Sequence, residues 1–182
     1  AVTQPADGGM VVLNEDGTAS FKPDANFNGP ATFTYTVSDG NGGTSDASVS
    51  ITVNAVNDTP VVQGESTDTS EDTTLYIAAS TLLANDSDVD TATDGQVLTI
   101  TAVSGATNGT VSMLANGDIQ FIPNANYHGA ASFTYTVSDG NGATTDASVS
   151  ITVNAVNDAP TGAVTISGST AVGSDRKSTR LN

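Results

Sequence analysis

Residues 121–158 read FIPNANYHGAASFTYTVSDGNGATTDASVSITVNAVND, and residues 21–58 read FKPDANFNGPATFTYTVSDGNGGTSDASVSITVNAVND. The two segments agree at 30 of 38 positions without a gap, at a separation of 100 residues. A separation of that size corresponds to a whole domain rather than to one turn of a solenoid. The sequence therefore predicts similar domains that follow one another in a row.

The register of this repeat sets the expected domain boundaries. Residues 1–58 align with residues 101–158, so we expect them to be the C-terminal half of a repeat whose N-terminal half is missing. Residues 59–158 make one complete repeat. Residues 159–182 are expected to begin a third repeat, and the change of composition from residue 175 onward indicates a non-native tail.

The complete repeat has the pattern of β-strands. Residues 133–138 and 149–153 alternate apolar and polar side chains with a period of two, and DGNG at 139–142 between them is typical of a hairpin turn. Five earlier strands are expected near residues 61–65, 73–78, 96–103, 109–114 and 118–122. Residues 78–84 are expected to form a single helical turn. This pattern predicts an all-β fold, a seven-stranded Greek-key β-sandwich.

The charge of the chain narrows the class of partner. Lysine and arginine number 4 against 20 aspartates and glutamates, which gives a formal net charge of -16. Nucleic acids and anionic lipids are bound by clustered cations, so neither is an expected partner. Cysteine is absent, and no stretch approaches the ~20 apolar residues of a membrane helix, so we expect no direct membrane insertion. Divalent cations are the expected counterions.

The acidic residues fall in loops at both ends of the predicted sandwich, because successive antiparallel strands alternate in direction. The end beside the preceding linker is expected to gather Asn57, Asp58, Asp86, Asp88, Asp90 and Asp139. The opposite end is expected to gather Glu71, Asp72, Asn157 and Asp158, with Asn124 and Asn126 nearby. Such oxygen ligands suit Ca²⁺. The alternative is that these acids only solubilise the surface and favour turns.

The sequence does not match an EF-hand calcium loop or the common catalytic motifs. The run from Asp86 to Asp90 begins like an EF-hand loop, but Thr91 stands where glycine is required and Val97 where the bidentate glutamate belongs. The single histidine, His128, lies in a turn whose counterpart is Asn28, and no G-x-S-x-G or H-E-x-x-H motif occurs. We therefore expect no enzymatic activity.

Four motifs recur in order and resemble a known family. They are F-x-P-x-A-N-[FY]-x-G at Phe21 and Phe121, FTYTVSDGNG at Phe33 and Phe133, VNDTP and VNDAP at Val56 and Val156, and NDSDVD at Asn85. Together they resemble the cadherin-like tandem repeats of large bacterial surface and repeats-in-toxin adhesins. The resemblance implies a cadherin-like, immunoglobulin-like sandwich that is extracellular.

The same resemblance implies calcium at the domain junctions. Asp88 and Asp90 resemble the family's D-x-D element, Glu71 or Asp72 its upstream acid, and Asp139 its late aspartate. The linkers match the family's Asn-Asp before proline, but they lack its third polar residue, and the L-D-R-E segment is absent. The number of ions per junction therefore stays open.

The leading functional hypothesis is an extender of a bacterial surface adhesin that is stiffened by Ca²⁺ and contacts neighbouring repeats of the same chain, while other domains bind host or surface glycans. The alternative is a module that itself binds carbohydrate or a matching repeat. The chain has no tryptophan, and only Tyr76 and Tyr127 fall outside a core pattern. A surface-layer protein is a further structural alternative.

Overall fold

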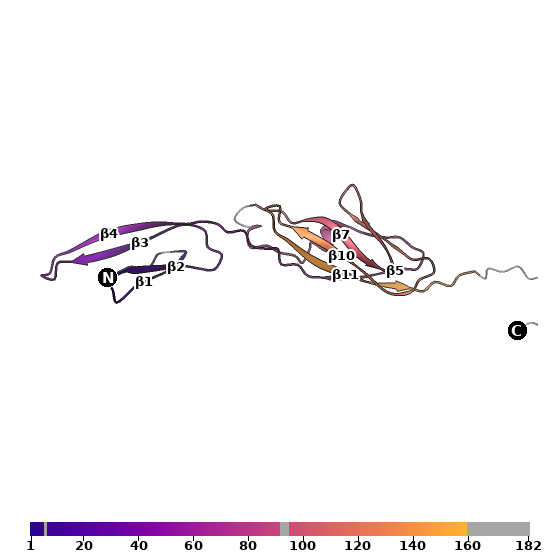
Figure 1. Cartoon of the computed structure of the whole chain (residues 1–182), viewed down its shortest axis with the longest axis horizontal. Coiled ribbons are helices and arrows are strands. Elements are labelled where there is room, and N and C mark those ends of the chain that lie inside the picture. The colour runs from indigo at the N-terminus through magenta and orange to yellow at the C-terminus, as the bar shows by residue number, and fades with distance from the viewer. Residues whose placement is uncertain (6, 92–94, 160–182) are drawn as a thin grey trace, which may run out of the picture.

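The computed structural model describes residues 1–5, 7–91 and 95–159. Residues 1–58, here called the first unit, contain β1 (Gly9–Leu13), β2 (Ala19–Pro23), β3 (Gly29–Ser38) and β4 (Thr44–Val53). The second unit, residues 59–158, contains β5 (Glu65–Ser70), β6 (Leu75–Ile77), α1 (Ala79–Leu82), β7 (Thr99–Thr107), β8 (Gly109–Met113), β9 (Ile119–Pro123), β10 (Gly129–Ser138) and β11 (Thr144–Asn154). Figure 1 shows the two units end to end. The expected third repeat and tail lie, after Ala159, outside the described residues.

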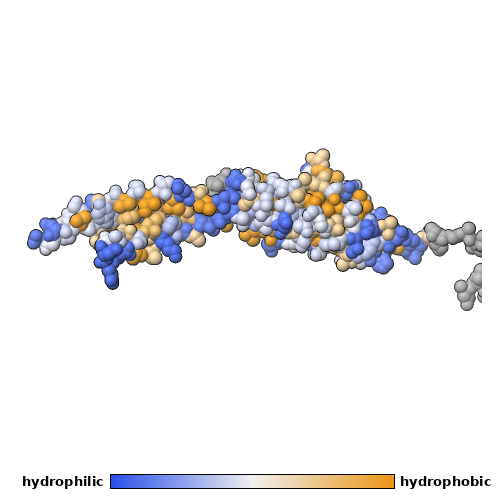
Figure 2. Space-filling model, viewed as in Figure 1, coloured by the Kyte–Doolittle hydropathy of each residue, from blue (hydrophilic) through white to orange (hydrophobic). Residues whose placement is uncertain are grey.

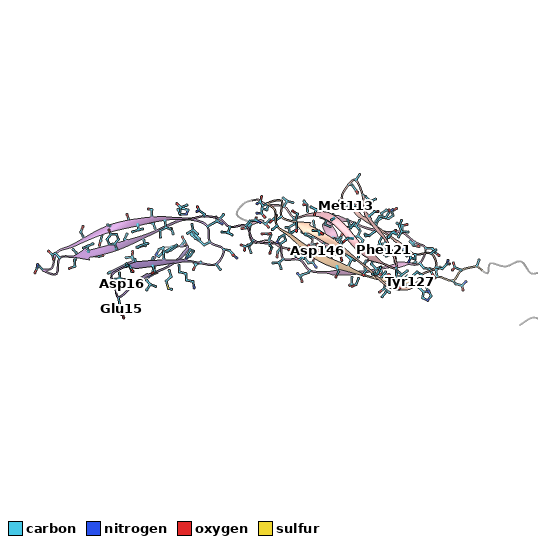
Figure 3. All side chains as sticks on the ribbon, in the orientation of Figure 1. Glu15, Asp16, Met113, Phe121, Tyr127 and Asp146 are labelled. Atoms are coloured by element: carbon cyan, nitrogen blue, oxygen red, sulfur yellow. The ribbon has the colours of Figure 1, made fainter. Side chains whose placement is uncertain are left out.

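Two sheets form the second unit. One has the strand order β5-β11-β10-β7 and the other β6-β9-β8, and the core lies between them. Phe121 of β9 and Phe133 of β10 stack across this interface, with ring centroids 6.2 Å apart and an interplanar angle of 22°; Figure 3 labels Phe121 within the sandwich. The predicted all-β sandwich is confirmed.

Strict alternation places the core residues of β10. Phe133, Tyr135 and Val137 are at most 1% exposed, because every second side chain of a strand points to the same face. The hairpin that joins β10 to β11 turns at Gly140 and Gly142, whose φ angles of 83° and 108° favour glycine. The alternation and the turn predicted for residues 133–153 are both confirmed.

The first strand of the second unit differs from the prediction. We expected a strand near residues 61–65, but Val61 makes only an isolated bridge to Ser87, and the strand begins at Glu65. This strand, β5, is polar in sequence because it lies at the edge of its sheet, where it pairs in parallel with β11. The expected helical turn is confirmed as α1, which buries Leu82.

The first unit consists of two hairpins in the registers of their counterparts. Gly9 pairs with Pro23 in the β1–β2 hairpin, as Gly109 pairs with Pro123. The β3–β4 hairpin likewise repeats the pairing of β10 with β11, residue for residue. Among the described parts of both units, no helix is long and apolar enough to span a membrane.

Candidate metal site at the linker

The linker before the second unit is held by two loops of that unit. The Asn57 side-chain amide donates to Asp139 Oδ2 over 2.6 Å, and the Asp58 main-chain N–H donates to Asp90 Oδ2 over 2.8 Å. Asp139 follows β10 and Asp90 follows α1, so segments distant in sequence meet here. The predicted convergence of these residues at one end of the sandwich is what the structure shows.

The loop after α1 turns two carboxylates inward. Asp88 and Asp90 are 8% and 5% exposed. The Asp90 N–H donates to Asp88 Oδ1 over 2.9 Å, and the Thr91 hydroxyl donates to the Asp88 carbonyl over 2.7 Å. These short-range bonds fix the loop so that both acids lie beneath the linker.

Gln96 also belongs to this cluster, although its sequence position gave no sign of it. Its side-chain amide donates to Asn57 Oδ1 over 2.9 Å, and the residue is 7% exposed. Gln96 Oε1 and Asp88 Oδ2 are both buried without a hydrogen-bond partner. Buried polar atoms are almost always satisfied, so two such oxygens in one cluster indicate a cationic or donor ligand.

Asp139 is held in its charged form by this arrangement. The Asn57 amide lowers the pKa of the Asp139 carboxyl, and the main-chain N–H groups of Asn141 and Ala143 lower it further, while burial opposes them. The counterpart Asp39 has a lowered pKa from its own turn alone, through Asn41 and Gly43. The linker contact is therefore what distinguishes the second turn from the first.

Asp86 makes its contacts elsewhere. Asp86 Oδ1 accepts the Gln63 N–H over 2.9 Å, just before β5. The Asp86 charge and burial together raise the pKa of Glu65, with burial the larger cause. The Tyr135 hydroxyl donates toward Glu65 Oε2 over 2.8 Å. This second carboxylate pair connects β5 to the loop after α1 and does not contact the linker through a described hydrogen bond.

The opposite end of the second unit brings fewer acids together. Glu71 is 6% exposed, and its Oε1 accepts the Val156 N–H of the next linker over 2.5 Å. Its Oε2 lies 3.8 Å from Nδ1 of His128. Figure 3 labels Tyr127 at this end.

The other predicted residues at this end of the second unit form hydrogen bonds with residues other than Glu71. Asp72 Oδ1 accepts the Asn126 N–H over 2.9 Å. The Asn157 amide donates only to the adjacent Asp158 carbonyl, over 3.3 Å, among the hydrogen bonds described. Asn124 donates its N–H to the Asn108 carbonyl, as an ordinary turn residue does.

The oxygens beside the first linker are chemically suited to a hard cation. Within the ranges described, no three His, Cys, Asp or Glu side chains are grouped closely enough to hold a metal by themselves. The hydrogen bonds instead connect a mixed set, in which Asp88, Asp90 and Asp139 take part through carboxylates and Asn57 and Gln96 through amides. Asp58 takes part through its main-chain N–H, and its side chain is exposed. Calcium accepts carboxylate, amide and carbonyl oxygens together, so the residues fit it.

A pocket of about 230 Å³ opens at the same joint. Its lining includes Asn26 and Asn28 of the first unit together with Asp58 and Asp90. Residues of both units therefore border the space beside the candidate site.

Solved structures similar to this chain include cadherins. Repeats 1 and 2 of human mucin-like protocadherin match with 17% identity and a TM-score of 0.50, covering 86% of this chain and 84% of that one. The extracellular domain of protocadherin gammaB4 matches with 18% identity and a TM-score of 0.46, over 84% and 27% of the two chains. The first of these shows the fold alone.

An endo-fucoidan hydrolase of glycoside hydrolase family 107 also matches, with 26% identity and a TM-score of 0.36 over 86% of this chain. The chain spans only 23% of the length of that enzyme. No curated protein sequence matches the chain.

The family profile described as a cadherin-like domain matches residues 1–54 and again residues 56–154. These ranges include both hairpins of the first unit, Asn57 and Asp58 of the linker and the whole sandwich of the second unit. Cadherin-like domains are non-catalytic, extracellular adhesion modules that generally bind calcium. The chain belongs to the cadherin-like domain family.

Proposed function

We propose that this chain is an extender of a bacterial cell-surface adhesin, in which residues 1–58 and 59–158 are successive repeats and Ca²⁺ stiffens the joint between them. The observation that carries the proposal is the pair of buried oxygens without partners, Asp88 Oδ2 and Gln96 Oε1, directly beside a linker that is bonded to two loops. A spacer needs a fixed angle between its units, and this cluster lies where that angle is set.

The electrostatics of the joint support a cation. Any two carboxylates of the joint brought within about 4 Å of each other would repel by about 1 to 4 kcal/mol between water-like and surface-like dielectrics. A divalent ion among Asp58, Asp88, Asp90 and Asp139 would offset this repulsion. At a hundred times its dissociation constant it would add about 2.7 kcal/mol to the free energy of unfolding. Extracellular modules typically bind calcium at ~0.1–1 mM.

The proposed ligands divide into two groups. Asp58, Asp88, Asp90 and Asp139 supply carboxylates, while Asn57 and Gln96 supply amide oxygens. Asp86 stays a predicted ligand at this end: its Oδ1 accepts the Gln63 N–H, and its Oδ2, like Asp88 Oδ2, is buried without a hydrogen-bond partner. At the opposite end, Glu71 is bonded to the next linker at Val156, which supports an equivalent joint formed with Asn157 and Asp158.

A calcium titration of the full chain tests the proposal. We expect calcium in the millimolar range to raise the melting temperature and to lengthen and narrow the distribution of solution dimensions measured by X-ray scattering. Asp88→Asn should abolish most of both responses. Asp46→Asn is the matched control, because it removes one carboxylate that only accepts the Thr36 hydroxyl on the first unit. Equal responses of the two variants would contradict the joint site.

The alternative, a repeat that binds sugar itself, has lost one of its two aromatic candidates. The Tyr127 hydroxyl donates to the Ala130 carbonyl over 2.6 Å and its ring packs against the core, whereas Tyr76 is 62% exposed. A glycan array probed with the chain and with its Tyr76→Ala variant distinguishes a sugar-binding repeat from an extender. Binding that depends on Tyr76 would favour the alternative, and antibody labelling of intact source cells checks the surface location.

A further inference from the structure

The turn between β10 and β11 carries the pair Asn141-Gly142 and lies at the joint between the units. Figure 1 shows β10 ending and β11 beginning at the end of the second unit that faces the first, and Figure 2 shows hydrophilic residues gathered at this joint. In the same turn, Asp139 accepts the Asn57 amide of the linker. A chemical change in this turn therefore affects the linker contact.

An asparagine that precedes a glycine can react with its own main chain. The glycine nitrogen loses its proton to a solvent base and bonds to the side-chain carbonyl carbon of the asparagine. The bond from that carbon to the amide nitrogen breaks, so ammonia leaves and a cyclic imide remains. One water then opens the ring, giving aspartate by attack at the side-chain carbonyl or isoaspartate by attack at the main-chain carbonyl. The reaction consumes water and needs no enzyme or oxidant.

The second unit has three such pairs, which begin at Asn108, Asn116 and Asn141, and all three asparagines are exposed. Exposure therefore does not rank them, but their hydrogen bonds do. The Asn108 amide donates to the Tyr127 hydroxyl and to the Ala130 carbonyl, each over 2.9 Å. Ring closure at Asn108 requires the side chain to leave both acceptors.

The second pair, at Asn116, is restrained on both reacting groups. The Asn116 amide donates to Asp118 Oδ2 over 2.7 Å, and its Oδ1 accepts the Asp118 N–H over 3.2 Å. The attacking nitrogen is that of Gly117, whose N–H donates to the Leu114 carbonyl over 2.9 Å. Both the side chain and the nitrogen must therefore give up partners before they react.

The third pair, at Asn141, lacks these restraints. Its described hydrogen bond is donated by the main-chain N–H, to Asp139 Oδ1, and none described involves its side-chain amide. The Gly142 N–H lies near the Asp139 carboxylate, but no main-chain hydrogen bond described for this turn uses it. A Cβ atom added at Gly142 would meet no atom beyond its chain neighbours within 4 Å, so the space beside the attacking nitrogen is open.

We propose that Asn141 is a site of spontaneous deamidation in the folded protein and that the reaction loosens the turn that holds the linker. Asp139 Oδ1 accepts the N–H groups of Asn141, over 2.8 Å, and of Ala143, over 3.1 Å, so the spacing of these two groups positions the carboxylate. Isoaspartate lengthens the main chain between them by a methylene group and adds a second carboxylate beside Asp139. The bond from Asn57 to Asp139 is then weakened. The inference does not rest on calcium.

The test follows the three sites by mass spectrometry while the full folded chain is kept in mildly alkaline buffer without divalent ions. A protease that cleaves before aspartate releases residues 139–145, in which Asn141 is the only asparagine. The same protease cuts at a newly formed aspartate but not at isoaspartate, so the two products are distinguished. We expect Asn141 to react at least about tenfold faster than Asn108 and Asn116, where hydrogen bonds must break first.

The Tyr127→Phe variant is the matched control for the ranking. It removes one acceptor of the Asn108 amide and keeps the ring in place. Asn108 should react severalfold faster in this variant, while the rate at Asn141 should not change.

The effect on the turn is measured by melting. Residues 33–42 and 133–142 are identical, so the comparison uses chains that carry Asn41→Gln to exclude the same reaction in the first unit. A chain kept in the buffer until residue 141 has reacted should melt at a lower temperature than the fresh chain. Asn141→Asp, which adds the charge without the methylene group, should melt between the two.

Three results would overturn the proposal. The first is the absence of reaction at Asn141. The second is an equal rate at Asn108, Asn116 and Asn141, because the reaction would then take place in the unfolded chain. The third is an unchanged melting temperature after isoaspartate has formed at residue 141, because the turn would then not hold the linker through Asp139.

Discussion

At the residue scale, two carboxylates of the second unit are shifted in opposite directions by their partners. Asp139 accepts hydrogen bonds from Asn57 and from its own turn, which lowers its pKa. Glu65 is partly buried near Asp86, which raises its pKa even though the Tyr135 hydroxyl opposes the shift. Folding therefore favours the charged form of one and the protonated form of the other.

We expect Glu65→Gln to raise the melting temperature at pH 7 by a few degrees in the absence of divalent ions. A raised pKa means that the folded state holds the proton more tightly than the unfolded state, so stability is gained as pH falls through the raised value. The substitution removes the charge and keeps an oxygen for the Tyr135 hydroxyl. Thermal melts between pH 7 and pH 4 check this, and the gain should shrink toward the acidic end. A variant less stable than the wild type at pH 7 would contradict it.

Asp139→Asn should behave in the opposite way. Its lowered pKa contributes stability that is present above the unfolded pKa of ~3.9 and is lost as pH falls through the folded value. We therefore expect the variant to melt lower at pH 7, and its difference from the wild type to vanish in strong acid. Asp39→Asn, in the equivalent turn without a linker contact, should cost less. Equal losses would show that the linker bond adds nothing.

The sequence predicted part of this cluster because loop position follows from strand order. Asp88, Asp90 and Asp139 could be assigned to one end of the sandwich from the alternation of strand direction alone. Gln96 could not, because a buried amide looks in sequence like any polar residue. The contacts of Asp86 were also unpredictable, since they depend on where β5 begins.

At the scale of the elements, a single hydroxyl connects three segments. Tyr135 of β10 points toward Glu65 at the start of β5, the Gln63 carbonyl before it and the Leu82 carbonyl at the end of α1. Tyr135 is 0% exposed and Leu82 is 1% exposed, whereas Glu65 is half-buried and Gln63 is exposed. The hydroxyl therefore holds the edge strand and the helical turn to the centre of the sheet.

Tyr135→Phe should lower the free energy of unfolding by about 1 to 3 kcal/mol, because it removes the donor that faces the half-buried Glu65 carboxylate and the buried Leu82 carbonyl. The matched control is Tyr35→Phe, at the equivalent position of the first unit, where the residue is 38% exposed and which should change stability by less than ~0.5 kcal/mol. Urea unfolding measures both. A loss of equal size at the two positions would mean that the contacts with β5 and α1 contribute nothing.

Some strands could be predicted from their sequences and others could not. In β10 and β11 apolar and polar side chains alternate, and the turn between them carries glycines where φ is positive. The alternation and the turn therefore both predicted the hairpin. β5 reads ESTDTS, which has no apolar residue. Its position follows from pairing with β11, a tertiary contact that no local pattern contains.

At the scale of the whole molecule, the two units offer an internal comparison. Residues 33–42 and 133–142 have the same sequence, so their intrinsic amide exchange rates match closely. Figure 1 shows β3 and β4 in the first unit, which is open, and β10 and β11 inside the sandwich of the second unit. We expect the amides of β3 and β4 to exchange faster than those of β10 and β11, as measured by hydrogen exchange with mass spectrometry. Equal protection would contradict the uncovered face of the first unit.

The parallel pairing of β5 with β11 has a mechanical consequence. Glu65 opposite Val149 and Ser70 opposite Asn154 mark the ends of a continuous ladder between the strands nearest the two linkers. Tension transmitted along the chain would draw these strands in opposite directions along their length. All the hydrogen bonds between β5 and β11 would then be loaded together in shear, instead of breaking one after another. Such a geometry resists stretching, and the force at which a single molecule ruptures should fall sharply when a proline is placed in β5.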